Sequence, residues 1–210
     1  QYRLVGEKLN LRIDMLAGPS EVLIVADDSA APASVAADML AQAEHDPLAL
    51  AILVTPHKPL ADAVLVELER QLPLLSREEI ARKALTDRGV ILLVDDLESA
   101  IQLANSVAIE HLELMIADPW AQVPHIRHAG AIFLGANTPE AAGDYIAGPN
   151  HVLPTMGTAR FASALGVETF LKKSSIISYS APGLVADAEH IMRLAKLEGL
   201  TAHAASIAVR

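Results

Sequence analysis

The sequence contains no cysteine, very few aromatic residues and no apolar run as long as a membrane-spanning helix. Without cysteine a disulfide is excluded, and any zinc site has to use imidazole, carboxylate or amide ligands. We therefore expect a cytoplasmic location and no membrane partner. Because aromatic residues make up only 3% of the chain, the core has to be built from Ala, Val, Leu and Ile.

The chain also lacks an excess of positive charge. Its formal net charge is −10, whereas a nucleic-acid-binding protein needs a basic face, so we expect no nucleic-acid partner. Apolar residues make up 52% and charged residues 20% of the 210 residues, which is ordinary for a globular protein with a sizeable core. The chain begins with Gln1 instead of Met, which leaves truncation or processing of a longer protein open.

Short apolar runs alternate with helical patterns between residues 18 and 137. The runs typical of buried strands are residues 21–26, 50–55, 89–94, 112–116 and 131–134. Helices are expected between them, up to about His45, at 59–72, from Ser76 onward, at 95–107 and at 120–128. Uncharged strands that alternate with helices predict a parallel sheet covered on both faces. We therefore expect an α/β fold with a doubly wound, mostly parallel, Rossmann-like sheet.

Several polar or special residues indicate where these helices begin and end. Asp27-Asp28-Ser29 offers N-cap side chains to the first helix, and Pro32 suits its first turn. Ser76 and Glu79 have the spacing of a capping box at the start of a later helix. Near the end of the chain, an amphipathic helix is expected at residues 183–198, with Gly199 as its C-cap.

Changes in composition divide the chain into four parts. They are an entry segment with a short strand near residues 11–15, the α/β domain, a loop-rich active-site segment, and a C-terminal helix with a tail, at residues 1–17, 18–137, 138–182 and 183–210. The third part is rich in Gly, Pro, Ser and Thr. The apolar tail, residues 200–210, is expected to dock, for example on another subunit, because free termini fray.

The first candidate site lies at residues 40–47, at the end of the first predicted helix. Gln42 and His45 are three residues apart and share one face of a helix, so an amide oxygen and an imidazole point the same way. Pro47 ends the helix, which places the pair at an element end, where active sites of α/β sheets collect. Such a pair is the start of a metal site. A solvated helix end that happens to carry His remains the alternative.

The second candidate site is Glu110-His111, between a predicted helix and a predicted strand. Neighbouring side chains diverge on both kinds of element, so the two aim at one site only at such a junction. A carboxylate beside an imidazole is a natural acid–base pair. A helix C-terminus that favours a protonated His, next to a surface Glu, is the alternative.

Two more sets lie toward the end of the chain. Asp144 and His151 flank a Gly-Pro turn in an apolar neighbourhood, and a loop this dense in special residues indicates function more than an Asx-type turn. Glu198 and His203 lie around Gly199 in the tail. The other histidines have no partner in the pattern and are interpreted as surface or structural: His57, His125, His128 and His190.

Together these stretches resemble the histidinol dehydrogenase family. The resemblance is carried by residues 13–21, 42–46, 109–112, 143–154 and 198–203, in the order and with nearly the spacing of the family. It runs from about Ile13 to Arg210 and covers about the C-terminal half of a typical member. These motifs are specific, and none is a generic fingerprint.

The resemblance implies roles for single residues. The positions that match zinc ligands are Gln42, His45, Asp144 and His203. Glu110 and His111 match the catalytic pair, and Ser20, His151 and Glu198 match substrate-contacting positions. Members are homodimers whose exchanged C-terminal tails reach the partner's active site. They oxidise L-histidinol to L-histidine with two NAD⁺, in the last step of histidine biosynthesis.

The resemblance leaves the cofactor and two alternatives open. The residues that bind NAD in the family lie largely in the N-terminal half, and no Gly-x-Gly-x-x-Gly occurs here. One alternative is a related zinc- and NAD-dependent dehydrogenase for another alcohol, such as a sulfonated diol. Glu198 argues weakly against it, because a carboxylate suits a cationic amino alcohol and repels a sulfonate. The other alternative is a catalytically silent zinc-binding fragment that needs an N-terminal companion segment.

Overall fold

The computed structural model describes residues 17–210, and the chain forms two compact units, Gln1–Phe170 and Leu171–Arg210. The short strand expected near residues 11–15 lies outside the described residues. Among the described residues, no helix has both the length and the apolar character that crossing a membrane requires.

The first unit is built on a five-stranded, all-parallel sheet in the order β3-β2-β1-β4-β5, which confirms the predicted α/β fold. The strands are β1 Glu21–Ala26, β2 Leu50–Thr55, β3 Val90–Leu93, β4 His111–Met115 and β5 Ala131–Leu134. Each coincides with a predicted apolar run to within one residue at either end. The strands at the centre of the sheet, β1 and β4, are buried along their whole length, as continuous apolar runs require.

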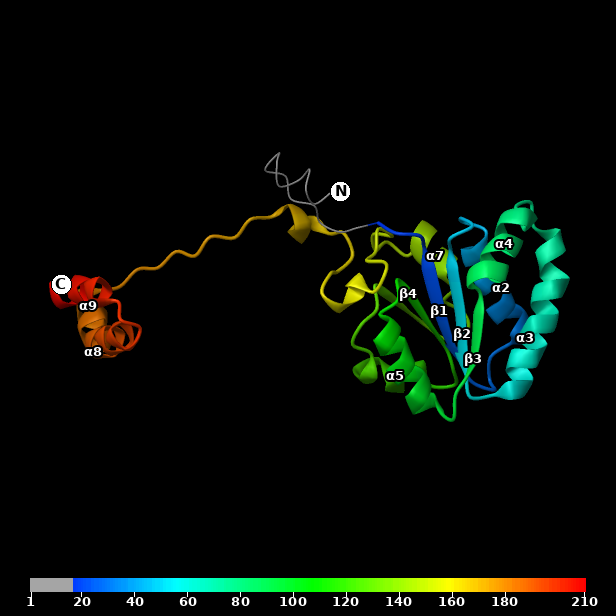
Figure 1. Cartoon of the computed structure of the whole chain (residues 1–210), viewed down its shortest axis with the longest axis horizontal. Helices are drawn as coiled ribbons and strands as arrows, with labels where there is room; N and C mark the ends of the chain where they lie inside the picture. The colour runs from blue at the N-terminus through cyan, green and yellow to red at the C-terminus, as the bar shows by residue number, and fades with distance from the viewer. Residues whose placement is uncertain (1–16) are drawn as a thin grey trace. The chain divides into compact units, whose positions relative to one another are not determined.

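Helices cover both faces of this sheet, as Figure 1 shows. On one face lie α2 Pro32–Ala43, α3 Lys58–Gln71 and α4 Glu78–Arg88, with the 3₁₀ turn Leu72–Leu74 between the last two. Their apolar residues form one core with Val22 and Ile24. On the other face, α5 Leu97–Val107 forms a second core with Leu23 and Val25, because neighbouring residues of a strand point to opposite faces.

Two of the expected helix N-caps are wrong. Asp27 does not cap α2, which begins after Ala31 with Pro32 in its first turn, because the Asp27 carboxylate binds the backbone N–H of Ser29 and Ala117 instead. The capping box at Ser76 does not form either, since Arg77 holds the N-cap position of α4 and no side chain caps that end. Asp96 does cap α5, accepting a hydrogen bond from the Ser99 N–H at 2.7 Å.

The helix expected at 120–128 is also wrong in extent. It is the single turn α6 Pro119–Gln122, capped by Asp118 and followed by the 3₁₀ turn Val123–His125. Pro124 has no N–H to donate, so the α-helical hydrogen-bond ladder does not continue through it. Asp118 and Pro119 therefore set where α6 begins, and Pro124 prevents the helix from continuing.

The last part of the first unit contains one more helix, α7 Glu140–Tyr145, which the sequence pattern did not reveal. It lies among loops and the 3₁₀ turns Thr158–Arg160 and Val167–Phe170. Glu140 is buried at the start of α7, and Gly143 faces Phe133 so closely that an added Cβ would lie 2.6 Å from the ring. Glycine therefore lets α7 approach β5.

The second unit is a pair of helices, α8 Ala181–Leu197 and α9 Thr201–Ala208, that pack against each other. Ser180 caps α8, accepting a hydrogen bond from the Gly183 N–H. Gly199 has a φ of +75°, which glycine adopts without strain, so the predicted end of this helix at Gly199 is confirmed. The tail expected after it is thus helical.

Candidate functional site

The candidate site lies where the parallel strands begin. His111 is the first residue of β4, Glu21 is the first residue of β1, and the two strands pair in parallel register. Helix α2 runs back toward the start of β2, so its last turn, with Gln42, returns to the same edge. Doubly wound proteins usually bind ligands at the opposite edge, outside the carboxyl ends of the strands. The pair Gln42 and His45 is therefore at an element end, but at the less usual edge.

Glu110 and His111 lie between α5 and β4, and their side chains are buried next to each other. Helix α5 ends at Ala108, whose positive φ of 57° turns the chain toward the sheet. Glu110 is 5% exposed and His111 3% exposed, with 3.6 Å between the Glu110 Oε2 and His111 Nδ1 atoms. Both are held by the backbone of Glu21: its N–H donates to Glu110 Oε2 at 2.8 Å, and its carbonyl oxygen lies 3.0 Å from His111 Nδ1.

This arrangement fixes the tautomer of His111. A carbonyl oxygen only accepts hydrogen bonds, so Nδ1 carries the proton and donates it to Glu21. In a neutral ring Nε2 then has a free lone pair, and this buried atom has no hydrogen-bond partner among the described residues. Burial lowers the pKa of His111, which favours the neutral ring at pH 7. His111 Nε2 is thus able to accept a proton.

Glu110 behaves differently. Burial raises the pKa of its carboxyl to about 8, against the opposing hydrogen bond from the Glu21 N–H. Glu110 therefore keeps its proton at neutral pH. Its carboxylate, the form that acts as a base, becomes more abundant as the pH rises. Two neighbouring groups, one neutral imidazole and one protonated carboxyl, are poised for different proton transfers.

Helix α7 brings two carboxyl groups to the same place. Glu140 and Asp144 are four residues apart and so share a face of α7. Glu140 Oε1 lies 3.8 Å from His111 Nδ1, and Asp144 Oδ1 lies 3.8 Å from His111 Nε2. Burial raises the pKa of Glu140 to about 9. One potential ligand atom from each of His45, Glu140 and Asp144 lies within 4.8 Å of the others, a spacing that fits one metal ion.

Gln42 adds evidence for a metal. Its side chain is fully buried, yet neither its amide oxygen nor its amide nitrogen has a hydrogen-bond partner among the described residues. A buried amide without partners is costly, and a metal bound to the oxygen would remove part of that cost. Imidazole nitrogen with carboxylate and amide oxygens is also a donor set that suits zinc. The residues present therefore fit a zinc ion.

The other predicted site residues fall into two groups. Ser20 directly precedes Glu21, and His151 is exposed but close enough to His111 for the two rings to interact through charge. Both belong to the first unit, with the residues around His111. Glu198 and His203 are exposed side chains of the second unit, at the end of α8 and in α9. The first unit thus brings His45, Glu110, Asp144 and His151 close to His111.

Sequence reasoning missed the buried carboxyl groups that surround this set. Glu21, Glu113 and Glu140 are each buried, at 7%, 1% and 3% exposure. A charged residue inside an apolar strand was a signal for Glu113, and the spacing of four from Asp144 was a signal for Glu140. The second signal depends on recognising α7, which the Gly- and Pro-rich composition hid.

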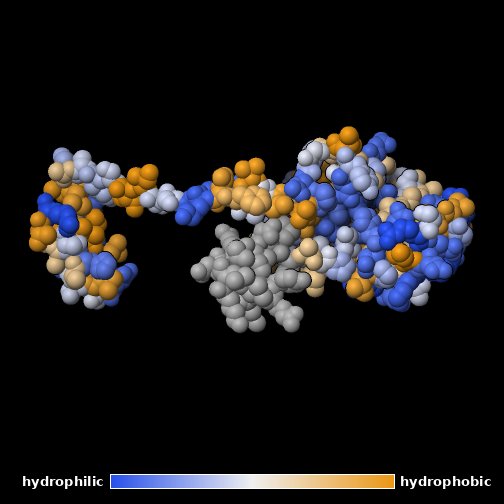
Figure 2. All heavy atoms as spheres, turned by 90° about the horizontal axis from the view of Figure 1, so that it is seen from above, coloured by the Kyte–Doolittle hydropathy of each residue, from blue (hydrophilic) through white to orange (hydrophobic). Residues whose placement is uncertain are grey.

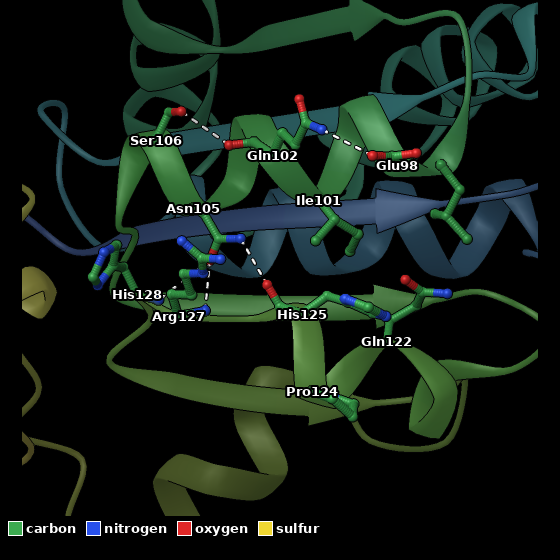
Figure 3. A pocket seen from close by; sticks show the side chains of 11 residues that line it. Glu98, Ile101, Gln102, Asn105, Ser106, Gln122, Pro124, His125, Arg127 and His128 are labelled. Carbon is green, nitrogen blue, oxygen red and sulfur yellow. Dashed lines mark hydrogen bonds between the residues drawn. The ribbon is translucent and has the colours of Figure 1, made fainter.

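A separate hollow lies between α5 and the α6 region (Figure 3). It has a volume of about 790 Å³ and is lined mostly by polar side chains, including His125, Arg127 and His128. The Asn105 side chain links its walls by donating to the His125 carbonyl oxygen and accepting from the Arg127 N–H. No predicted site residue lines it. The hollow is therefore separate from the candidate site at the amino edge of the sheet.

The carboxyl edge of the sheet does not fit a dinucleotide in the usual way. The pyrophosphate of such a cofactor lies against a glycine-rich turn after the first strand. Here β1 is followed by Asp27, whose carboxylate accepts from the Ser29 and Ala117 N–H groups at 2.9 Å each. A carboxylate in this position occupies backbone donors and repels a phosphate. At this turn, the residues that the structure describes provide no such site for NAD.

The known proteins with similar sequences that are compared with this chain are histidinol dehydrogenases. The sequence pattern of the histidinol dehydrogenase family matches residues 3–210. Histidinol dehydrogenase from Desulfotalea psychrophila is 76% identical over 200 residues, which are 95% of this chain and 46% of that protein. Its counterpart from a Synechococcus species is 60% identical over 212 residues, which cover 100% of this chain and 49% of that protein.

A solved structure agrees with both sequence matches. The crystal structure of histidinol dehydrogenase from Elizabethkingia anophelis superimposes with a TM-score of 0.93 at 38% identity, covering 98% of this chain and 47% of that one. The chain therefore spans about half the length of the relatives that it matches. The match over nearly all of these residues confirms the resemblance drawn from the motifs, and the chain belongs to the histidinol dehydrogenase family.

Proposed function

We propose that this chain supplies the zinc-binding and catalytic residues of an enzyme that oxidises L-histidinol to L-histidine, through the aldehyde, with two NAD⁺. One observation carries the proposal. A buried neutral imidazole, His111, lies next to a group of potential metal ligands that includes His45 and Asp144. Family membership supports the choice of substrate. Because the chain spans about half of its relatives, the reaction is proposed for the assembled protein.

The proposed zinc ligands are Gln42, His45, Asp144 and His203. The first three belong to the first unit, where Gln42 has an unpartnered amide oxygen and the other two approach each other. His203 would come from α9, either of the same chain or of a partner copy. When bound, zinc would hold the alcohol oxygen of the substrate and make its proton more acidic. Gln42 contributes an oxygen without adding negative charge.

The proton transfers are assigned to the adjacent pair. His111 would accept the proton of the alcohol oxygen on Nε2, which lets the carbon that bears this oxygen give up hydride to NAD⁺, and the Glu21 carbonyl keeps Nδ1–H in place. The resulting aldehyde has to be hydrated before a second hydride can leave. Glu110, once ionised, accepts a proton from the attacking water. Burial of both side chains keeps bulk water from competing for these protons.

The proposed substrate contacts favour a cationic substrate. Glu198 is a proposed substrate contact together with Ser20 and His151. An amino alcohol such as L-histidinol is attracted by an acidic side chain such as Glu198, whereas a sulfonated diol is repelled. The site therefore gives less support to the related dehydrogenase for a sulfonated substrate.

We further propose a homodimer in which the second unit of each chain reaches the partner's site. The surface of this unit carries apolar side chains that need cover, visible as orange spheres around α8 and α9 in Figure 2. They include Val185, Leu194, Leu197 and Val209, which are 70%, 63%, 76% and 81% exposed. Burial of such a surface in an interface is favourable. The exchange would also deliver Glu198 and His203.

Zinc binding by the chain should depend on His45. The His45→Ala variant is expected to bind zinc roughly 10–100-fold more weakly than the unsubstituted chain, because it loses an imidazole ligand. Competition with a chromogenic chelator measures this affinity. The His125→Ala variant removes an exposed imidazole outside the site and should bind zinc as the unsubstituted chain does. Equal affinity for His45→Ala and the unsubstituted chain would contradict the proposed ligand set.

Removal of residues 200–210 should weaken the dimer. The deletion takes away α9 and the apolar residues around it, so sedimentation at a concentration where the full chain is dimeric should show mainly monomer. Val66→Ser changes an exposed apolar residue of α3 in the first unit and should leave the dimer intact. A full chain that is monomeric at every concentration tested would rule out the exchanged tails.

A further inference from the structure

Glu113 is a buried carboxyl group in the middle of β4 to which no role has been assigned above. Its side chain is 1% exposed, although β4 is otherwise apolar after His111. Oε1 accepts a hydrogen bond from the Glu140 backbone N–H at 2.8 Å, across 27 residues of sequence. Buried backbone N–H groups are nearly always hydrogen-bonded, so Glu113 supplies the partner that this N–H needs.

That N–H belongs to the first residue of α7. The N-cap position before it is Pro139, whose side chain has no acceptor, and no side chain within α7 caps this end. Glu113 thus does from the sheet what an N-cap residue normally does from the helix. Because α7 has only six residues, it depends on such contacts for its stability. Asp144, which faces His111, lies one turn further along α7.

The Glu113 carboxyl also interacts with helix α2. Its Oε2 atom has no hydrogen-bond partner among the described residues, and the Asp38 carboxyl of α2 is near enough to interact with Glu113 through charge. Burial raises the pKa of Glu113 to about 8 and that of Asp38 to about 6, so the pair keeps one proton at neutral pH. Asp38 lies one turn before Gln42 on the same face of α2. Glu113 therefore connects the two helices that present Asp144 and Gln42.

We propose that Glu113, together with Asp38, is a positioning residue that holds α7 and α2 against β4, so that Asp144 and Gln42 reach the same place as His111. The inference rests on the proposed function for what is positioned. Glu113 would act through its hydrogen bond with the Glu140 N–H and its interaction with the Asp38 carboxyl, and not through direct contact with substrate or metal. Loss of the carboxyl group would release α7 before it affects the sheet, whose core is apolar.

The test compares Glu113→Ala with Glu113→Gln in the full 210-residue chain. Alanine removes both contacts, whereas glutamine keeps an oxygen that accepts from the Glu140 N–H and an amide that donates to Asp38. Hydrogen exchange of the α7 amides reports the helix, and chelator competition reports zinc affinity. We expect Glu113→Ala to lose amide protection in α7 and to bind zinc roughly 10–100-fold more weakly. Glu113→Gln should keep protection and bind zinc within about twofold of the unsubstituted chain.

Asp118→Ala is the matched control. It removes a carboxylate that caps α6, another very short helix of the first unit, which carries no proposed site residue. It should leave α7 protection and zinc affinity unchanged. If Glu113→Ala does not fold, Asp38→Ala gives the same comparison by removing the α2 carboxyl that interacts with Glu113, with partial loss of both signals expected.

Two results separate this inference from the proposed function. If His45→Ala weakens zinc binding but Glu113→Ala keeps both α7 protection and zinc affinity, the positioning role is overturned and the metal site stands. If α7 loses protection in Glu113→Ala while His45→Ala binds zinc normally, Glu113 positions α7 as inferred and the proposed metal site is wrong. If Glu113→Gln loses α7 amide protection and zinc affinity as much as Glu113→Ala does, the inference is overturned as well.

Discussion

His111→Ala is expected to lower histidinol-dependent NADH formation by roughly 10²–10⁴-fold, the usual loss when a general base is removed. The enzyme for this test is the chain combined with the part of the Desulfotalea psychrophila relative that it does not match. The loss follows from the geometry, since Nε2 of His111 is the buried lone pair that faces the metal-ligating group. Absorbance of NADH at saturating L-histidinol measures the effect.

His128→Ala is the control for this variant. His128 lines the separate hollow beside α5 and should be replaceable without loss of rate. Turnover of His111→Ala within about threefold of the unsubstituted enzyme would be far too high for the loss of a general base, and would assign the proton transfer to another group.

The same assembled enzyme should show the titration of Glu110. Because burial raises its pKa to about 8, its base form is scarce at pH 6 and becomes more abundant as the pH rises. A bound cation lowers the pKa of a nearby carboxyl, so the rate of aldehyde oxidation should increase with a midpoint at or below about pH 8. In Glu110→Gln this increase should be lost together with most of the rate.

The second large effect concerns the chain by itself, which should give no detectable turnover. Hydride transfer needs the nicotinamide within near-attack distance, about 3–3.5 Å, of the substrate carbon, and such positioning contributes effective molarities of roughly 10⁵ M or more. The turn after β1, where Rossmann-like sheets bind a dinucleotide, carries the Asp27 carboxylate instead of glycines. The chain therefore has the proposed proton-transfer and metal-binding groups without a recognisable cofactor site at that turn.

Adding back the part of the relative that the chain does not match, fused or as a separate polypeptide, should restore NADH formation. The control is the same added part without the 210-residue chain, which lacks the proposed catalytic pair. Robust turnover by the chain alone would show that its own residues bind NAD. No turnover by the reconstituted pair, with zinc bound, would favour the silent zinc-binding fragment over the dehydrogenase.

The sheet was predictable because the signal for its strands is local and strong. Each strand is a short run of apolar residues with few charges, and such runs suit strands buried on both faces. Helix starts were less predictable, because an acidic or hydroxyl side chain binds whichever N–H the tertiary structure brings near. Asp27 illustrates this, since it binds Ala117 on the neighbouring strand's loop and not the first turn of α2.

The site was predictable only in part, for a related reason. Glu110 and His111 could be paired because a junction between helix and strand is visible in the sequence, and Gln42 and His45 because helical spacing is. Glu140 could not, since α7 is too short for a periodic pattern and is stabilised by Glu113 from a different element. Long-range contacts of this kind leave no local trace.

The central claim is that a metal ion binds at the amino edge of the sheet, beside His111. Crystals of the chain grown with zinc and measured at the zinc absorption edge test it most directly. We predict an anomalous peak about 2.0–2.2 Å from a His45 nitrogen and an Asp144 oxygen, with the Gln42 amide oxygen as a further ligand. A peak in the hollow lined by His125 and His128, with none beside Asp144, would contradict it.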